Sequence, residues 1–360
     1  MPGKALDFFL GSLSPTGFHN YFKNAYPQLE QGTVLLLKSG PGCGKSRLLS
    51  QISQKLLNSG ETIERIHCSA DPSCLDGILC PHLHFAAFDA TGPHNLEPDY
   101  PLAFERIVPF YSFLDSNILS KQRARIAELS DTNRHASERA ARYLSAAACL
   151  LKDTERSALC CTDVEKVQRF ARTLSHRYFP HPGQGAQEDI RLLSAITPNG
   201  IVFFDQTISK LAKNIIVLDD PYGAVGRILM KELRKNALEL KHSVITCHCP
   251  LDPPDKIDHI ILPKQQVAFV LSSSYFPLQF TEQRTIHATR FMNHEGLVAR
   301  KKRIRFNQKA SRDLLAQATK LYKEAEQART SLKDCYGFAC REKEQKQELS
   351  RLEDAILSSL

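Results

Sequence analysis

Short runs of consecutive apolar residues alternate along the chain with longer segments in which apolar residues recur every three or four positions. Residues 34–37 and 85–88 are runs of the first kind, which is typical of strands buried on both faces of a sheet. Residues 48–56 are a segment of the second kind, with their leucines and isoleucine on one side of a helix. Buried strands that alternate with amphipathic helices predict an α/β fold.

A glycine-rich turn joins the first of these strands to the first of these helices. In "LLLKSGPGCGKSRLL" it follows the P-loop pattern G-x-x-x-x-G-K-[ST], except that Ser39 replaces the first glycine. Glycines let backbone N–H groups turn toward a phosphate, and a helix N-terminus adds partial positive charge. Lys45 is expected to reach the β- and γ-phosphates, and the Ser46 hydroxyl to hold Mg²⁺. The predicted nucleotide-binding residues are Ser39, Gly40, Pro41, Gly42, Cys43, Gly44, Lys45, Ser46 and Arg47.

A second acid is needed to complete this magnesium site. Asp89 ends the apolar run 85–88, at the sheet edge where α/β proteins bind ligands, so we predict that it is the Walker B aspartate. A turn aspartate after a core strand is the alternative. Asp71 and His67 are candidates to face the γ-phosphate, with the capping of a strand end as their alternative role. The predicted catalytic residues are Lys45, Asp89 and Asp71, the metal ligands are Ser46 and Asp89, and the cofactors are ATP and Mg²⁺.

Several short motifs occur twice in the same order, which predicts an internal duplication. "IHCSADP" is followed much later by "CHCPLDP", and "SPTG" by "TPNG". The offsets in numbering are nearly constant, at 197 − 14 = 183, 248 − 67 = 181 and 263 − 81 = 182. The matched segments are 9–22 with 192–205, 66–72 with 247–253, and 77–88 with 259–270.

The stretch "NIIVLDDPYGAVGR" (214–227) has two interpretations. Its apolar run before Asp219 and Asp220 fits a Walker B strand, but an ABC-type signature is missing. Aligned with the first glycine loop at an offset of 227 − 47 = 180, both acids fall within the loop instead. This alignment places Val225 at Lys45 and Gly226 at Ser46, and therefore favours a former phosphate loop that has lost its binding groups.

Polar segments with helical apolar spacing follow each half. "FLDSNILSKQRARI" (113–126) is matched by "FMNHEGLVARKKRI" at an offset of 291 − 113 = 178. We predict two tandem P-loop NTPase-like parallel-sheet domains, each with a helical appendage. Residues 1–178 carry the intact site and an appendage from about 113 to 178, and residues 190–360 carry the degenerate site and an appendage from about 286 to 360.

Composition adds little to this interpretation. The net charge of +8 arises from 47 basic and 39 acidic residues, with a basic tract at "ARKKRIRFNQK" (299–309). That tract is weak evidence for a protein or nucleic-acid partner, because basic faces are usually only solvated. No apolar run reaches the roughly 18 residues that span a bilayer, and the 11 cysteines come without a secretory signal. We therefore expect reduced thiols, a cytoplasmic location and no membrane partner.

Two cysteine hypotheses remain. "HCSADPSCLDGILCPHLH" is rich in zinc-binding residue types, but it lacks a C-x-x-C pair, and its later members are not repeated in the second half. Cys43 lies within the phosphate loop, so its oxidation is a candidate way to block nucleotide binding.

At "GPGCGKS", "HCSADPSCLDGIL", "DATGPHNLEPDYPLAFERI" and "AITPNG", the chain resembles a family of bacterial proteins described as P-loop ATPases. Proteins of that family have about this size and are built from two P-loop-like halves. The resemblance covers most of the chain, and it implies nucleotide binding without implying a particular reaction or substrate.

The sequence therefore predicts an ATP-binding P-loop NTPase. Mg-dependent hydrolysis or phosphoryl transfer is expected in the first half, with the second half as an inactive partner. ATP is favoured over GTP because no N-K-x-D motif follows the loop. The alternatives are a nucleotide-dependent switch or scaffold with negligible turnover, and a small-molecule kinase.

Overall fold

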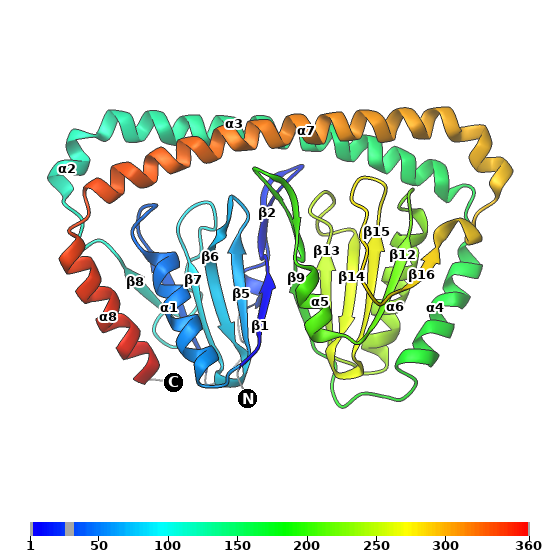
Figure 1. Cartoon of the computed structure of the whole chain (residues 1–360), viewed down its shortest axis with the longest axis horizontal. Coiled ribbons are helices and arrows are strands. Elements are labelled where there is room, and N and C mark those ends of the chain that lie inside the picture. Colours follow the sequence, from blue (N-terminus) through cyan, green and yellow to red (C-terminus); the bar gives the residue numbers. More distant parts are fainter. Residues whose placement is uncertain (1–2, 26–31, 359–360) are drawn as a thin grey trace.

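The computed structural model describes residues 3–25 and 32–358. Two six-stranded sheets lie side by side, and a pair of long helices crosses over both of them (Figure 1). None of the helices in the described ranges combines the length and apolarity needed to span a membrane.

The first sheet has the strand order β1-β5-β6-β7-β4-β8. A separate two-stranded ribbon, β2 with β3, precedes β4 in the chain. Helix α1 (Lys45–Asn58) follows β4. Neighbouring strands run parallel except at β6, which is antiparallel to both β5 and β7. The strands are β1 (Ala5–Phe8), β2 (Gly11–Ser14), β3 (Gly17–Asn20), β4 (Thr33–Lys38), β5 (Ile63–Cys68), β6 (Asp71–Cys80), β7 (Phe85–Asp89) and β8 (Glu105–Pro109).

The second sheet repeats this arrangement with the order β9-β13-β14-β15-β12-β16. Its ribbon is β10 with β11, followed by α5 (Asp205–Leu211), and α6 (Ala224–Glu239) follows β12. The strands are β9 (Glu188–Arg191), β10 (Ser194–Thr197), β11 (Gly200–Phe203), β12 (Asn214–Asp219), β13 (Val244–His248), β14 (Ile257–Leu262), β15 (Val267–Ser272) and β16 (Arg284–His287).

The predicted α/β class is confirmed, but the sheets are mixed rather than parallel. The single antiparallel strands, β6 and β14, also occupy equivalent places. The connections to their neighbours are short, from residues 69–70 between β5 and β6 to residues 249–256 between β13 and β14. Such a short connection can form a hairpin, whereas a parallel crossover needs a dozen residues or more. The His-Cys and Asp-Pro motifs flank this turn in the first half, and their copies lie at the start and within the connection between β13 and β14.

The helices after each sheet cross to the other half (Figure 1). From the first half come α2 (Ser116–Lys121), α3 (Arg123–Leu159) and α4 (Val164–Tyr178); from the second come α7 (His294–Phe338) and α8 (Glu342–Ser358). Helix α3 packs along α7, and α4 then contributes to the core of the second sheet. Helix α8 likewise contributes to the core of the first sheet. The two appendages are therefore exchanged between the halves.

One hydrophobic core runs through the junction of the two sheets. Phe9 and Leu192 exchange backbone hydrogen bonds of 2.8 and 2.9 Å, and both side chains are buried. The recurring histidines also belong here. His67 packs against Phe204 from the other half, and His248 stacks on Tyr21. Because each fully buried side chain of this size contributes about 1.5–3 kcal/mol, the halves are firmly associated.

Candidate functional site

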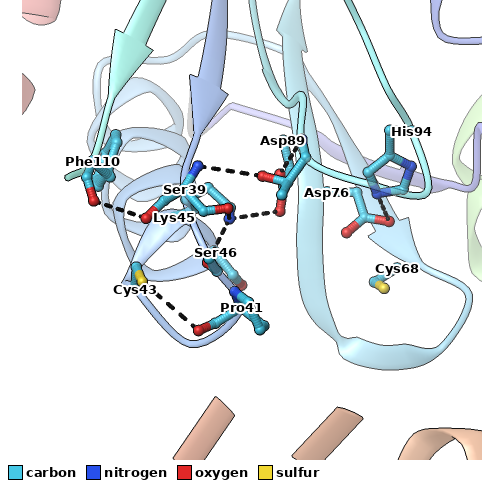
Figure 2. Close-up of polar contacts among 12 residues, drawn as sticks. Ser39, Pro41, Cys43, Lys45, Ser46, Cys68, Asp76, Asp89, His94 and Phe110 are labelled. Atoms are coloured by element: carbon cyan, nitrogen blue, oxygen red, sulfur yellow. Dashed lines mark hydrogen bonds and ion pairs between the residues drawn. The ribbon is translucent and has the colours of Figure 1, made fainter. Parts of the chain in front are cut away.

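The predicted phosphate loop joins the C-terminal end of β4, in the first sheet, to the start of α1 (Figure 2). Two of its glycines have left-handed backbone angles, with φ of +77° at Gly42 and +85° at Gly44. Residues with a Cβ rarely adopt these angles, so the glycines allow the tight turn into α1. The described structure contains no acceptor for the backbone N–H groups of Gly44, Lys45 and Ser46. Those groups are free to bind an anion at the helix N-terminus.

Lys45 and Asp89 lie next to each other in this site. The Lys45 ammonium is 3.5 Å from Asp89 Oδ2, and only 6% of its side chain is exposed. It also donates to the carbonyl oxygens of Gly40 at 2.9 Å and Ser39 at 3.3 Å. Strands β4 and β7 are adjacent and parallel, with Leu37 paired to Asp89, and this register brings the acid to the loop. Two residues that are distant in sequence thus form one buried charged site.

Ser39 and Thr91 hold the loop in place. The Thr91 N–H donates to Asp89 Oδ1 at 2.9 Å, and the Ser39 N–H donates to Thr91 Oγ1 at 3.4 Å. The Ser39 hydroxyl donates to the carbonyl of Phe110, just beyond β8, at 2.8 Å. The serine that departs from the P-loop pattern therefore links the loop to both neighbouring strands, a role that the sequence pattern does not indicate.

The other predicted residues are divided between this site and its surroundings. The Ser46 hydroxyl accepts a 2.9 Å hydrogen bond from the Leu75 N–H, and the Arg47 side chain is exposed on α1. Asp71 begins β6 and is 3.0 Å from the ammonium of Lys333 in α7. Burial alone would raise the pKa of Asp71, but hydrogen bonds from Ser73 and Cys74 and the Lys333 charge hold it well below the usual value. Asp71 is therefore a charged partner of α7.

Helices from the second half pack directly on the glycine loop. A methyl group added to Gly40 would overlap the ring of Tyr336 in α7. One added to Gly42 would lie 2.9 Å from the Lys333 carbonyl oxygen, and one added to Gly44 would lie 3.2 Å from Leu349 in α8. None of these neighbours is predicted from the sequence.

A signal for these neighbours is nevertheless present in the repeat. The ion pairs Lys333–Asp71 and Lys152–Asp252 match each other across the two halves, with equal offsets of 333 − 152 = 181 and 252 − 71 = 181. In each pair a lysine of a long helix contacts the aspartate of a repeated Asp-Pro motif in the other half. Because the lysine and the aspartate both recur at the same offset, the repeat indicates that each long helix contacts the sheet of the other half.

The second loop is two residues shorter than the first. Residues 39–44 separate β4 from α1, whereas residues 220–223 separate β12 from α6. This difference corrects the alignment made from the sequence: Asp219 ends its strand like Lys38 and Asp220 replaces Ser39. The counterparts of Lys45 and Ser46 are Ala224 and Val225, and neither side chain has a lysine ammonium or a hydroxyl.

The carboxylate of Asp220 closes this second loop from within. It accepts backbone hydrogen bonds from Tyr222 at 3.1 Å, Gly223 at 2.9 Å and Gly226 at 2.7 Å. The side chain is completely buried, and burial raises its pKa although the three N–H donors act in the opposite direction. At the equivalent of Asp89 stands Leu271, paired with Leu218. A carboxylate of the chain itself thus occupies the N–H of Gly223, the counterpart of Gly44, together with those of Tyr222 and Gly226 on either side.

The cysteine- and histidine-rich motif has structural neighbours. Cys68 accepts from Arg329 of α7 at 3.1 Å, and burial raises its pKa to about 12. Asp76 Oδ2 lies 3.2 Å from Nε2 of the buried His94. Within the described ranges no three His, Cys, Asp or Glu side chains are grouped so as to hold a metal ion. Burial also raises the pKa of Cys43, which disfavours the reactive thiolate.

Comparisons of the chain with profiles of protein families, with curated proteins and with solved structures gave no match. The geometry of the first loop is therefore the basis on which a function is assigned.

Proposed function

We propose that the first half binds a nucleoside triphosphate together with Mg²⁺ through the loop 39–46. The main support is the juxtaposition of Lys45 with Asp89 at 3.5 Å, beside the open N-terminus of α1. A buried lysine, an acid on the adjacent parallel strand and free backbone donors together fit the β- and γ-phosphates of a nucleotide and their metal ion.

Each group then has a defined role. The N–H groups of residues 44–46 would hold phosphate oxygens, and Lys45 would exchange its contacts with the Ser39 and Gly40 carbonyls for the β- and γ-phosphates. The Ser46 hydroxyl and the Asp89 carboxylate are hard oxygen ligands of the kind that Mg²⁺ prefers. When bound, the metal neutralises charge on the phosphates. Thr91 keeps Asp89 oriented throughout.

ATP hydrolysis or phosphoryl transfer is the reaction class that such a site supports, with ATP as the expected nucleotide. A nucleotide-dependent switch is the second candidate, and a specific contact favours it. Tyr336 and Lys333 of α7 lie on the glycine loop, and α7 extends to the second sheet. A nucleotide that changes the loop therefore acts directly on an element shared by both halves.

The test is calorimetric titration of ATP·Mg into the wild-type chain and into Lys45→Ala. The variant should bind ATP roughly 100-fold more weakly, because the principal cation for the β- and γ-phosphates is lost. Asp89→Asn should weaken ATP binding in the presence of Mg²⁺ more than in EDTA.

Lys55→Ala is the matched control, since Lys55 lies on the same helix and pairs with Glu353 and Asp354 of α8. It should leave ATP affinity unchanged. Equal ATP affinity in wild type and a folded Lys45→Ala protein would refute the proposed site.

A further inference from the structure

The exposed face of α7 carries a concentration of positive charge that neither the fold nor the nucleotide site requires. Residues 297–312 contain seven Lys or Arg residues and no Asp or Glu. We name five of them the basic strip: Lys301, Lys302, Arg305, Lys309 and Arg312. All five are exposed, and none forms an ion pair with another described residue.

The basic strip lies opposite the packed face of α7. The buried positions Ile304, Asn307 and Ser311 face α3, where Asn307 donates to Asp153 at 2.6 Å and Ser311 to the Ala147 carbonyl at 3.5 Å. Positions 302, 305, 309 and 312 recur at helical spacing on the other side. The α3–α7 pair forms one outer side of the molecule (Figure 1).

The internal repeat supplies a control for the origin of this charge. At the offset of 297 − 119 = 178, the counterpart of 297–312 is 119–134, with four basic and two acidic residues. Arg125–Glu128 and Arg134–Asp131 pair within that segment. The net charges are 7 − 0 = +7 and 4 − 2 = +2. Since the counterpart packs in the same helix pair with far less unbalanced charge, packing does not account for the strip.

We infer that the basic strip binds single-stranded nucleic acid. Its length, from 301 to 312, is about 17 Å at 1.5 Å per residue, which matches about five phosphates along a stacked strand. Phe306 lies within this segment with 67% of its surface exposed. An exposed aromatic ring next to a basic track is what stacking of unpaired bases requires.

An anionic membrane surface is the less favoured partner. A helix that binds in the interface needs an apolar face to bury among the lipids. The apolar face of α7 is already packed, with Leu297, Ile304, Ala318 and Leu321 buried. Among the described residues, Val298 and Phe306 alone remain as exposed large apolar side chains near the strip.

The test is fluorescence anisotropy of a labelled thymidine or uridine homopolymer of about 20 nucleotides, over roughly 50 to 200 mM salt. Five phosphate contacts predict a slope of log affinity against log salt of about −3.5. The variant Lys302→Gln, Arg305→Gln, Lys309→Gln should reduce the slope by about 2 units. Phe306→Ala should weaken binding by about tenfold and leave the slope unchanged. Comparison of the two homopolymers distinguishes DNA from RNA.

The control variant is Arg172→Gln, Lys231→Gln, Lys235→Gln, which removes the same charge from exposed positions of α4 and α6. It should bind as wild type does, and circular dichroism should show that both triple variants are folded. The inference is overturned if the wild type does not bind at the lowest salt concentration, if both triple variants weaken binding equally, or if the protein binds vesicles of phosphatidylserine and phosphatidylcholine but neither homopolymer.

Discussion

The two glycine-containing loops of this chain occupy the same place in two equivalent sheets, yet they satisfy their backbone donors differently. The first places a lysine ammonium next to an aspartate and leaves the N–H groups at the start of α1 open. The second loop is two residues shorter, and the Asp220 carboxylate accepts three hydrogen bonds from backbone N–H groups of the loop and of the first turn of α6. A strand, a turn and a helix therefore do not make a phosphate site by themselves, because a carboxylate of the chain can occupy the donors.

The two long helices also approach the loops that they cover to different extents. Tyr336 and Lys333 of α7 touch the glycines of the first loop, whereas the nearest side chain to a methyl group added at Gly223 would be Glu155 of α3, at 3.7 Å. Glu155 pairs with Arg227 at 2.5 Å, which in turn contacts Asp252. The second loop thus lies beside a network of charge pairs, whereas the first is packed closely against a helix.

The largest expected effect is on the loop that Asp220 closes. Asp220→Ala leaves the buried N–H of Gly226 and the half-buried N–H groups of Tyr222 and Gly223 without their acceptor, and should lower the free energy of unfolding by about 3 kcal/mol in urea denaturation. Asp220→Asn retains one carbonyl acceptor and should cost about half as much. The matched change Ser39→Ala removes the bond to Phe110 and should cost about 1 kcal/mol. Equal losses for Asp220→Ala and Ser39→Ala would contradict the difference between the loops.

An intermediate effect is expected where α7 covers the first loop. Gly40 has no positive φ, so alanine is strained there only by the overlap with Tyr336. Gly40→Ala should lower the free energy of unfolding without nucleotide by about 1–3 kcal/mol. In a Tyr336→Ala background the same change should cost less than about 0.5 kcal/mol. A full cost in that background would show that the strain has another origin.

The smallest effect concerns the two equivalent ion pairs. Lys333→Met should cost about 1 kcal/mol, because Asp71 loses its cation, whereas Lys152→Met should cost a few tenths, because Asp252 keeps Arg227. The folded pKa of Asp71 is depressed below the unfolded value of about 3.9. The Lys333 contribution should therefore be complete above about pH 5 and lost as the pH falls through the folded pKa. Urea titrations of the wild type and both variants at several pH values measure these costs. A Lys333 contribution that becomes smaller when the pH is raised from 5 to 7 would contradict this assignment.

Much of the fold follows from local sequence patterns. The apolar runs before Ser39 and Asp89 predict strands, and the motifs around His67 and His248, which recur at a nearly constant offset, predict two equivalent halves. The direction of β6 is not predicted, because apolar runs do not distinguish parallel from antiparallel neighbours. It is the short turn before Asp71 that sets the direction.

The candidate site is only partly predictable. The P-loop pattern identifies Lys45 and Ser46 by local chemistry, and the register of β4 with β7 places Asp89 beside them. The contacts of Tyr336 and Lys333 depend on the crossing of α7 to the first half, which no local pattern encodes. The sequence alignment also does not reveal that the second loop is shorter. The strands before the two loops differ in numbering by 214 − 33 = 181 and the helices after them by 224 − 45 = 179, and an alignment with one intermediate offset conceals this difference.

The number of nucleotides bound per chain tests the central claim most directly. Native mass spectrometry of the wild-type chain with saturating ATP·Mg should detect one nucleotide per chain. Asp220→Ala should also bind one, because Ala224 and Val225 supply neither the ammonium nor the hydroxyl of the first loop. Two bound nucleotides in the wild type, or none, would contradict the assignment of an open first loop and a closed second loop.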